Sequence, residues 1–167
     1  VYASVSGTVK AIAPHLNPAG GTVSGIIVEN DGQYEEVEYP AVKPLDEMSK
    51  EEILNAIGEA GIVGMGGAGF PTKVKLSPKE PDKIDYVIAN CAECEPYITA
   101  DYRRMLENPE KLVGGMKAVL KLFDNAKGLF GVEDNKPDCI AKLKELTKDE
   151  PRMEVLALKT KYPQGGE

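Results

Sequence analysis

The sequence predicts an α/β protein in which a parallel sheet is flanked by helices and preceded by a small all-β segment. Three observations predict this fold class. Short apolar strand patterns alternate with helical patterns from residue 84 onward, as they do in parallel sheets. The first 40 residues instead contain short β-branched runs separated by Gly, Pro and Asn. The composition, 42% hydrophobic and 28% charged, is that of a globular chain.

The N-terminal segment, residues 1–40, is expected to be all-β. Its β-branched runs predict strands at Thr8–Ile12, Thr22–Val28 and Tyr34–Tyr39. The stretch Pro40–Met48 has the composition of a linker. Residues 41–167 then form the expected α/β domain.

A helix is expected to follow the linker. Ser49 and Glu52 are spaced as in a capping box, in which each side chain accepts a hydrogen bond from the other residue's backbone. Ile53, Leu54 and Ile57 then lie at helical spacing and predict one apolar face.

The rest of the chain alternates between strand and helix patterns, which predicts a parallel sheet covered by helices on both faces. The expected strands are Ile84–Ala89, Gly128–Val132 and Met153–Leu158, and the expected helices are Pro109–Phe123 and Pro137–Leu146. The charged run Asp101–Lys111 is expected to be a solvated helix face with pairs four residues apart.

Charge and composition exclude several classes of function. A net charge of −7 argues against nucleic-acid binding, which normally needs a basic face. No apolar run approaches the roughly 20 residues of a membrane helix, so no direct membrane insertion is expected. Three cysteines are an odd number and favour a reducing cytoplasm over a secreted disulfide scaffold. Because the sequence starts at Val1 without a methionine, we expect a piece of a longer protein.

A glycine-rich loop with a basic flank is the first candidate site. The stretch "GIVGMGGAGFPTKVKL" places four glycines close together and two lysines, Lys73 and Lys75, just after them. Glycines here could let bare backbone amides approach a phosphate, or could simply allow a tight turn. The loop does not match the Walker A pattern, and a helix rather than a strand precedes it. The lysines favour an anion, because an acidic protein has few other reasons to place cations beside exposed amides.

The ends of the predicted strands are the second candidate site. Ligands of open α/β sheets bind beyond the carboxyl ends of the strands. Three segments leave such ends: "NCAECEPYITADYRR", "EDNK" and "KTKYPQGGE". In the first segment, Asn90, Glu93 and Glu95 are expected to face a ligand. In the last segment, Tyr162 is a candidate lid over a flat ligand.

The Cys91–Cys94 pair has the spacing of thiol-redox and metal sites. A zinc or iron–sulfur site needs about four ligands, and no second pair is apparent. Pro96 and Tyr97 stand where a redox dithiol would begin a helix. We therefore expect small sulfur side chains packed behind a ligand loop, and no metal site in this chain.

Three segments together resemble a known family. "GIVGMGGAGFPTKVKL", "NCAECEPYITADYRRM" and "YPQGGE", in that order, strongly resemble the flavin-binding domain shared by the C subunit of the Rnf electron-transport complex and the 51 kDa NADH-oxidising subunit of respiratory complex I. The forms "AECEPYITAD" and "ASVSGTVKAI" look closer to the Rnf protein. The resemblance implies a Rossmann-like α/β domain of the complex I flavin-binding type. It also implies that residues 1–40 are part of a lipoyl-like barrel-sandwich segment.

The resemblance implies FMN as cofactor, NAD(H) as substrate and electron transfer to iron–sulfur or ferredoxin-type carriers. No catalytic side chain is implied, because the flavin carries the hydride chemistry. The cofactor-binding positions that it implies are Gly64, Gly66, Gly67, Lys75, Asn90, Glu93, Gly165 and Glu167. Phe70 and Glu95 would contact NADH. The partners that it implies are other members of an Rnf-type complex or a soluble reductase, on the cytoplasmic face of the membrane or free in the cytoplasm.

The sequence departs from the complex I pattern at three positions: Met65 replaces an arginine, Ala92 an aspartate and Pro78 an aromatic residue. These differences put a flavin contact and a nucleotide-stacking contact in doubt. The resemblance places 4Fe–4S clusters and the end of the flavin pocket beyond Glu167, so the α/β domain is expected to be truncated. Alternatives are a soluble electron-transfer protein serving cobalamin or proline reductase, a non-catalytic assembly module and a thiol–disulfide protein.

Overall fold

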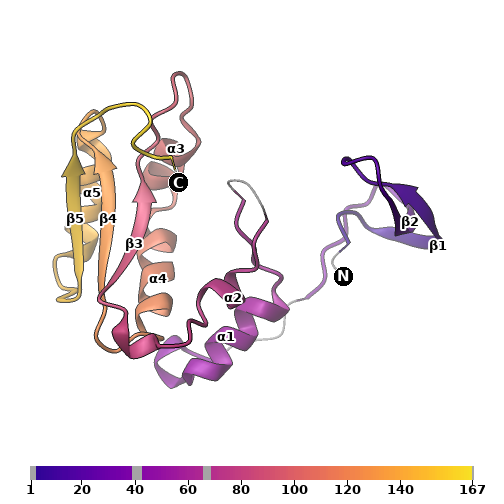
Figure 1. Cartoon of the computed structure of the whole chain (residues 1–167), viewed down its shortest axis with the longest axis horizontal. Coiled ribbons are helices and arrows are strands. Elements are labelled where there is room, and N and C mark those ends of the chain that lie inside the picture. Colours follow the sequence, from indigo (N-terminus) through magenta and orange to yellow (C-terminus); the bar gives the residue numbers. More distant parts are fainter. Residues whose placement is uncertain (1–2, 39–42, 66–68, 167) are drawn as a thin grey trace. The chain divides into compact units, whose positions relative to one another are not determined.

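A computed structural model describes residues 3–38, 43–65 and 69–166 of the chain (Figure 1). The chain divides into two compact units, Val1–Lys43 and Pro44–Glu167. Within the described ranges, no helix has both the length and the apolar character that crossing a bilayer requires.

The first unit is an antiparallel hairpin of β1 (Gly7–Leu16) and β2 (Thr22–Asn30). Both strands were predicted and both are longer than predicted. The third predicted strand, Tyr34–Tyr39, is wrong for its described residues, which form no strand. The chain turns there instead, because Tyr34 has a φ of 55°. Tyr39 lies outside the described residues.

The second unit begins with the 3-10 turn η1 (Leu45–Glu47) and the helix α1 (Lys50–Glu59). The predicted capping box of α1 is confirmed. The Glu52 amide donates to Ser49 Oγ at 3.2 Å, and the Ser49 amide donates to Glu52 Oε2 at 2.8 Å. Ile53 of the predicted apolar face is 3% exposed and lies in the core.

A parallel sheet in the order β3-β4-β5 forms the centre of this unit (Figure 1). Its strands are β3 (Tyr86–Cys91), β4 (Lys127–Glu133) and β5 (Met153–Leu158). The other elements are α2 (Thr72–Lys75), η2 (Pro81–Lys83), α3 (Ala100–Glu107), α4 (Pro109–Leu120) and α5 (Pro137–Thr147). The predicted strands and helices of this region are therefore confirmed, with shifts of a few residues at their ends. The charged run begins α3, where Arg103 and Glu107 form the expected ion pair four residues apart.

Helices cover one face of the sheet, so the prediction of two covered faces is wrong for the described residues. The core lies between that face and α4 and α5, around Phe130 and Leu143. On the opposite face, Tyr86 and Ile88 of β3 are 57% and 67% exposed. The strands follow one another in a single direction, and right-handed crossovers then place successive helices on the same side.

Candidate functional site

The segment after β5 passes over the carboxyl edge of the sheet and reaches the loop that leaves β3, residues 91–99 (Figure 1). This loop is called the β3 exit loop below, and residues 159–166 are called the strap. Asn90 Nδ2 donates to the Gly165 carbonyl at 3.0 Å. The Gly165 amide in turn lies 3.3 Å from Cys94 Sγ. The predicted convergence of the β3 and β5 exits is therefore observed.

The strap comes closest to the β3 exit loop at Gly165. A Cβ atom on residue 165 would lie 2.0 Å from the Ala92 carbonyl oxygen. That separation is far shorter than any real contact, and the atom it meets is backbone. A glycine is therefore required for the strap to reach the β3 exit loop.

Glu93 uses its carboxylate to begin α3. Oε1 accepts from the Asp101 amide at 2.8 Å, and Oε2 accepts from the Tyr102 amide at 3.1 Å. These amides belong to the first turn of α3, where an acidic group is favourable. Glu93 is 7% exposed, whereas Glu95 on the same loop is exposed to solvent. The predicted cofactor contact of Glu93 stays a prediction.

Sequence reasoning missed a buried ion pair in the turn after β4. Glu133 is fully buried, and its Oε2 lies 3.0 Å from the ammonium of Lys136, which is also buried. Lys136 Nζ donates to the Glu93 carbonyl at 3.2 Å. Glu133 Oε1 is buried without a hydrogen-bond partner among the described residues. The available signal was the "EDNK" segment, which follows a predicted strand and carries opposite charges three residues apart.

The neighbouring Asp134 connects the β4 exit with the strap. Its Oδ1 accepts from the Thr160 hydroxyl at 2.6 Å and from the Thr160 amide at 3.0 Å. These hydrogen bonds hold the pKa of Asp134 below its usual range. The turn after β4 thus contacts the β3 exit loop through Lys136 and the strap through Asp134.

An open pocket of about 340 Å³ lies between the β3 and β4 exits. Its lining includes Glu95, Tyr97, Tyr102, Asn135 and Thr160. Carboxylate, amide and hydroxyl groups beside aromatic rings suit a neutral planar ligand that donates hydrogen bonds. The pocket is therefore chemically compatible with a base or a ribose.

The glycine-rich loop is a short hairpin beside α1 and α2. Val63 and Pro71 form a β-bridge, and the Gly64 amide donates to the Phe70 carbonyl at 2.8 Å. The Gly64 amide therefore closes the hairpin and is not free for a ligand. Gly69 has a φ of 63°, the left-handed conformation that glycine favours. The predicted Gly66 and Gly67 lie outside the described residues.

The two lysines after this hairpin have different surroundings. Lys73 Nζ donates to Asn55 Oδ1 at 2.8 Å, which connects α2 to α1. Lys75 is exposed, and its ammonium forms no hydrogen bond or ion pair with any described residue. An unpaired cation beside a glycine turn is chemically suited to bind a phosphate group. Phe70, the predicted stacking residue, is 53% exposed and available.

The predicted site residues thus fall into two clusters. Asn90, Glu93 and Gly165 lie at the carboxyl edge of the sheet, whereas Gly64 and Phe70 belong to the glycine hairpin and Lys75 to α2, which follows it. Among residues 43–65 and 69–166, no hydrogen bond or ion pair connects the hairpin to the strand exits. Glu167 lies outside the described residues.

The cysteines do not form a redox pair of exposed thiols. Cys91 points into the core, where burial raises the pKa of its thiol to about 11. Cys94 is half-buried at the strap. No group of three or more His, Cys, Asp or Glu side chains in the described part of the chain is placed to hold a metal ion.

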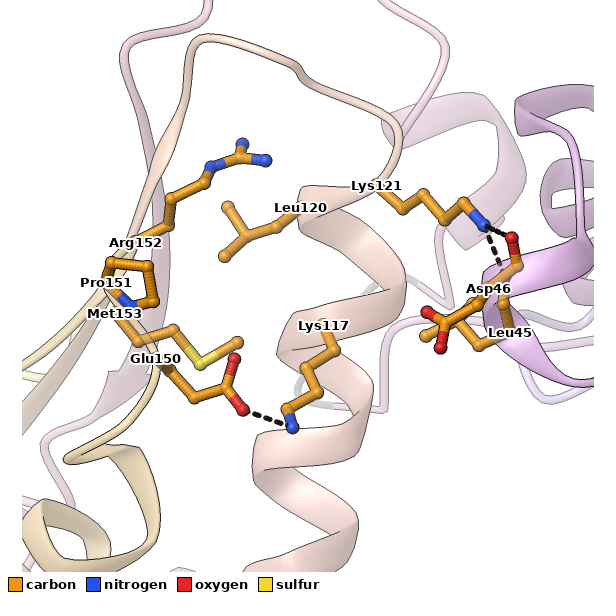
Figure 2. A pocket seen from close by; sticks show the side chains of 9 residues that line it. All are labelled: Leu45, Asp46, Lys117, Leu120, Lys121, Glu150, Pro151, Arg152 and Met153. Atoms are coloured by element: carbon orange, nitrogen blue, oxygen red, sulfur yellow. Dashed lines mark hydrogen bonds and ion pairs between the residues drawn. The ribbon is translucent and has the colours of Figure 1, made fainter.

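A second pocket, of about 400 Å³, lies at the amino end of β5 (Figure 2). Its charged side chains other than Asp46 already have partners. Lys117 pairs with Glu150, and Lys121 donates to the carbonyls of Leu45 and Asp46. Arg152 Nε donates to the Ala126 carbonyl at 2.9 Å. These contacts hold the turn after α4, which is a structural role.

Comparison with known proteins supplies the family context. The model of the Nuo51 FMN-binding domain matches residues 57–167. The C subunit of the proton-translocating ferredoxin:NAD(+) oxidoreductase complex of Clostridium ljungdahlii is 47% identical over the whole chain. The C subunit of the Na(+)-translocating complex of Acetobacterium woodii is 44% identical, again over the whole chain. The chain spans 36% and 38% of the length of these two relatives.

A solved structure shares the fold. The NAD+-reducing NiFe hydrogenase in its air-oxidized state superposes with a TM-score of 0.59 and 25% sequence identity. The match covers 74% of this chain and 25% of the hydrogenase chain. The α/β fold predicted from the sequence is thereby confirmed.

Proposed function

The chain belongs to the family of the Nuo51 FMN-binding domain, and on this premise we propose that it binds FMN and transfers electrons between NAD(H) and iron–sulfur or ferredoxin-type carriers. The observation that carries the proposal is the match over residues 57–167, which contains both residue clusters. Relatives at 47% and 44% identity are named as the C subunits of ion-translocating ferredoxin:NAD(+) oxidoreductase complexes. We therefore place the chain in an Rnf-type oxidoreductase complex.

In this proposal the glycine hairpin receives the FMN phosphate. Lys75 supplies the positive charge that the phosphate needs, because Lys73 is already bonded to Asn55. Gly66 and Gly67, which lie outside the described residues, would supply backbone amides as hydrogen-bond donors. Gly64 keeps the hairpin closed through its bond to Phe70.

The strand exits receive the ring system and the nucleotide. Asn90, Gly165 and Glu167 lie along the isoalloxazine, and Glu93 supports this edge by fixing the start of α3. Glu95 and Phe70 contact NADH, the first by accepting hydrogen bonds and the second by stacking. Bound FMN would supply the chemistry that accepts a hydride and passes its two electrons on one at a time. The protein residues would bind and orient FMN and NADH and keep water out of the site.

The proposal extends to partners. The names of the relatives favour other members of an Rnf-type complex over a soluble cobalamin or proline reductase. Attachment to a membrane would then come through those partners, on its cytoplasmic face. The 4Fe–4S clusters would belong to regions of the protein outside this chain.

The experiment that tests this proposal is a titration of FMN into the chain, followed by quenching of flavin fluorescence. Lys75→Ala should raise the dissociation constant about tenfold or more, which corresponds to about 1.4 kcal/mol. Lys79→Ala is the matched control, because Lys79 is also exposed and its loss changes the net charge equally. That variant should bind within about twofold of wild type.

Two outcomes would contradict the proposal. Absence of saturable binding by the wild-type chain would mean that these residues do not bind FMN by themselves. Equal binding by wild type and Lys75→Ala would mean that the glycine hairpin is only a turn.

A further inference from the structure

The end of β4 and the turn after it carry two buried charges at the carboxyl edge of the sheet. Glu133 is 0% exposed and Lys136 is 8% exposed. Their ion pair of 3.0 Å is shielded from solvent, so the two charges depend on each other and on their few polar neighbours. None of the motifs that resemble the flavin-binding family includes either residue.

The ammonium of Lys136 reaches across to the β3 exit loop. It donates to the carbonyl of Glu93 at 3.2 Å, besides its contact with Glu133. The side chain of the same Glu93 accepts from the amides of Asp101 and Tyr102. Lys136 therefore holds the backbone of the residue whose carboxylate starts α3.

This arrangement fixes which glutamate of the loop faces outward. With its backbone held by Lys136 and its side chain held by α3, Glu93 cannot turn toward solvent. Glu95, two residues later, is left exposed at the pocket between the β3 and β4 exits. The ion pair thus sets the direction of the loop that carries Glu95.

Stability alone does not explain an ion pair at this position. Buried ion pairs can often be replaced by apolar side chains of similar volume without loss of stability. Glu133 Oε1 is moreover buried with no partner among the described residues, which is unfavourable. A directional contact with the Glu93 carbonyl, in contrast, needs a hydrogen-bond donor, which an apolar side chain lacks and the Lys136 ammonium supplies.

We propose that Lys136, supported by Glu133, is a positioning residue that holds the β3 exit loop in the conformation required by the ligand site. The contact with the loop is a property of the chain by itself. Only its consequence for ligand binding rests on the proposed function. The test therefore has one readout without any ligand and one readout with FMN.

The first readout is the hydrogen-exchange rate of the Asp101 and Tyr102 amides, measured by NMR without FMN. Lys136→Met leaves Glu133 buried and unpaired and can fail to fold, so the double variant Glu133→Gln/Lys136→Met is used beside it. We expect these two amides to exchange about tenfold faster or more in the double variant. Glu133→Gln alone should give rates between those of wild type and the double variant, because the glutamine oxygen still accepts from Lys136 but no longer supplies the opposite charge. Unchanged rates in the double variant would overturn the proposal.

The second readout is the dissociation constant of FMN. It should rise about tenfold or more in the double variant. Arg152→Met is the control for general destabilisation, because Arg152 holds carbonyls at the opposite edge of the sheet. It should change neither the two amide rates nor the affinity. An equal loss of affinity in Arg152→Met and the double variant would overturn the functional part of the proposal.

The two readouts separate the proposals. If the wild-type chain does not bind FMN, the proposed function fails, and the exchange rates still decide whether Lys136 holds the loop. If FMN binds normally to the double variant while the Asp101 and Tyr102 amides exchange fast, Lys136 holds the loop but the ligand site does not require it.

Discussion

Burial divides the polar residues of the β3 exit loop by chemical role. Glu93 is surrounded by protein and makes two hydrogen bonds to amides of α3. Glu95 is exposed and keeps its carboxylate for a ligand. The same side chain therefore serves as a helix cap in one position and as a candidate contact for NADH two residues later.

The cysteines of the same loop give a prediction at the residue scale. A thiol with a pKa of about 11 carries a thiolate in about one molecule in a thousand at pH 8. Because the thiolate is the reactive form and Cys91 is also buried, we expect iodoacetamide to modify Cys94 first. Cys91 and Cys139 should react only after unfolding. Mass spectrometry of peptides from native and unfolded protein measures this order, and equal labelling of Cys91 and Cys94 in the native chain would contradict it.

The burial of Cys91 and Cys139 makes the stability of the folded chain depend on pH in the alkaline range. The thiols of Cys91 and Cys139 both have pKa values of about 11 in the folded chain, above the ordinary value of 9.0. The folded state therefore favours their protonated forms. The stabilisation that this gives to the folded state is present in full below pH 9. It is lost as the pH rises from 9 to 11. A smaller fall of the unfolding midpoint over this range in Cys139→Ala than in wild type would support the assignment.

At this scale the sequence predicts the location of the candidate site more successfully than it predicts the contacts of each residue. Asn90, Glu93 and Gly165 were all expected at the strand exits and are found there. The partner of Glu93 was not predictable, because it depends on the return of α3 onto the loop. Lys136 was missed for a similar reason: its burial arises only from the packing of the β3 and β4 exits.

At the scale of elements, the strap is held at two points. Thr160 bonds to Asp134 near its start, and Gly165 contacts Asn90 and Cys94 near its end. Between these points the strap covers the carboxyl edge of the sheet (Figure 1). Its position therefore depends on close backbone approach as much as on side chains.

Substitution of Gly165 should release the end of the strap. In Gly165→Ala the new Cβ would lie 2.0 Å from the Ala92 carbonyl, and rotation of a side chain cannot relieve a backbone contact. We expect a loss of about 1–3 kcal/mol in the free energy of unfolding, measured by urea denaturation. The control is Gly114→Ala in α4, where the added Cβ meets open space. That variant should be more stable by about 0.5–1 kcal/mol, because alanine favours the helix. A neutral Gly165→Ala would contradict the close contact.

Local sequence patterns predict helices and strands well where the tertiary packing favours the same structure. The strand Met153–Leu158 was predicted with its observed ends, and the capping box of α1 was read directly from Ser49 and Glu52. The expected strand after β2 failed because Asx turns follow Asn30: its Oδ1 accepts from the Gly32 amide at 2.8 Å. The covered face of the sheet was misjudged because strand order, which decides the side of each helix, is not a local property.

At the scale of the molecule, the hydrophobic core belongs to one unit. Every buried core residue in the described part of the chain lies between Ile53 and Val155, within the unit Pro44–Glu167. The hairpin of the first unit instead exposes apolar side chains such as Ile12 and Leu16, which are 70% and 71% exposed. The core and both candidate clusters therefore consist of residues of the second unit.

This division predicts that the second unit folds alone. A chain restricted to Pro44–Glu167 should keep its thermal midpoint within about 2 °C of the whole chain, because no core residue is removed. A peptide of residues 1–43 should show no cooperative transition by circular dichroism, since an isolated two-stranded hairpin is at best marginally stable in water. A fall in the midpoint of more than about 5 °C would mean that the hairpin stabilises the second unit. An unchanged midpoint would mean that residues Pro44–Glu167 are sufficient to fold both candidate clusters.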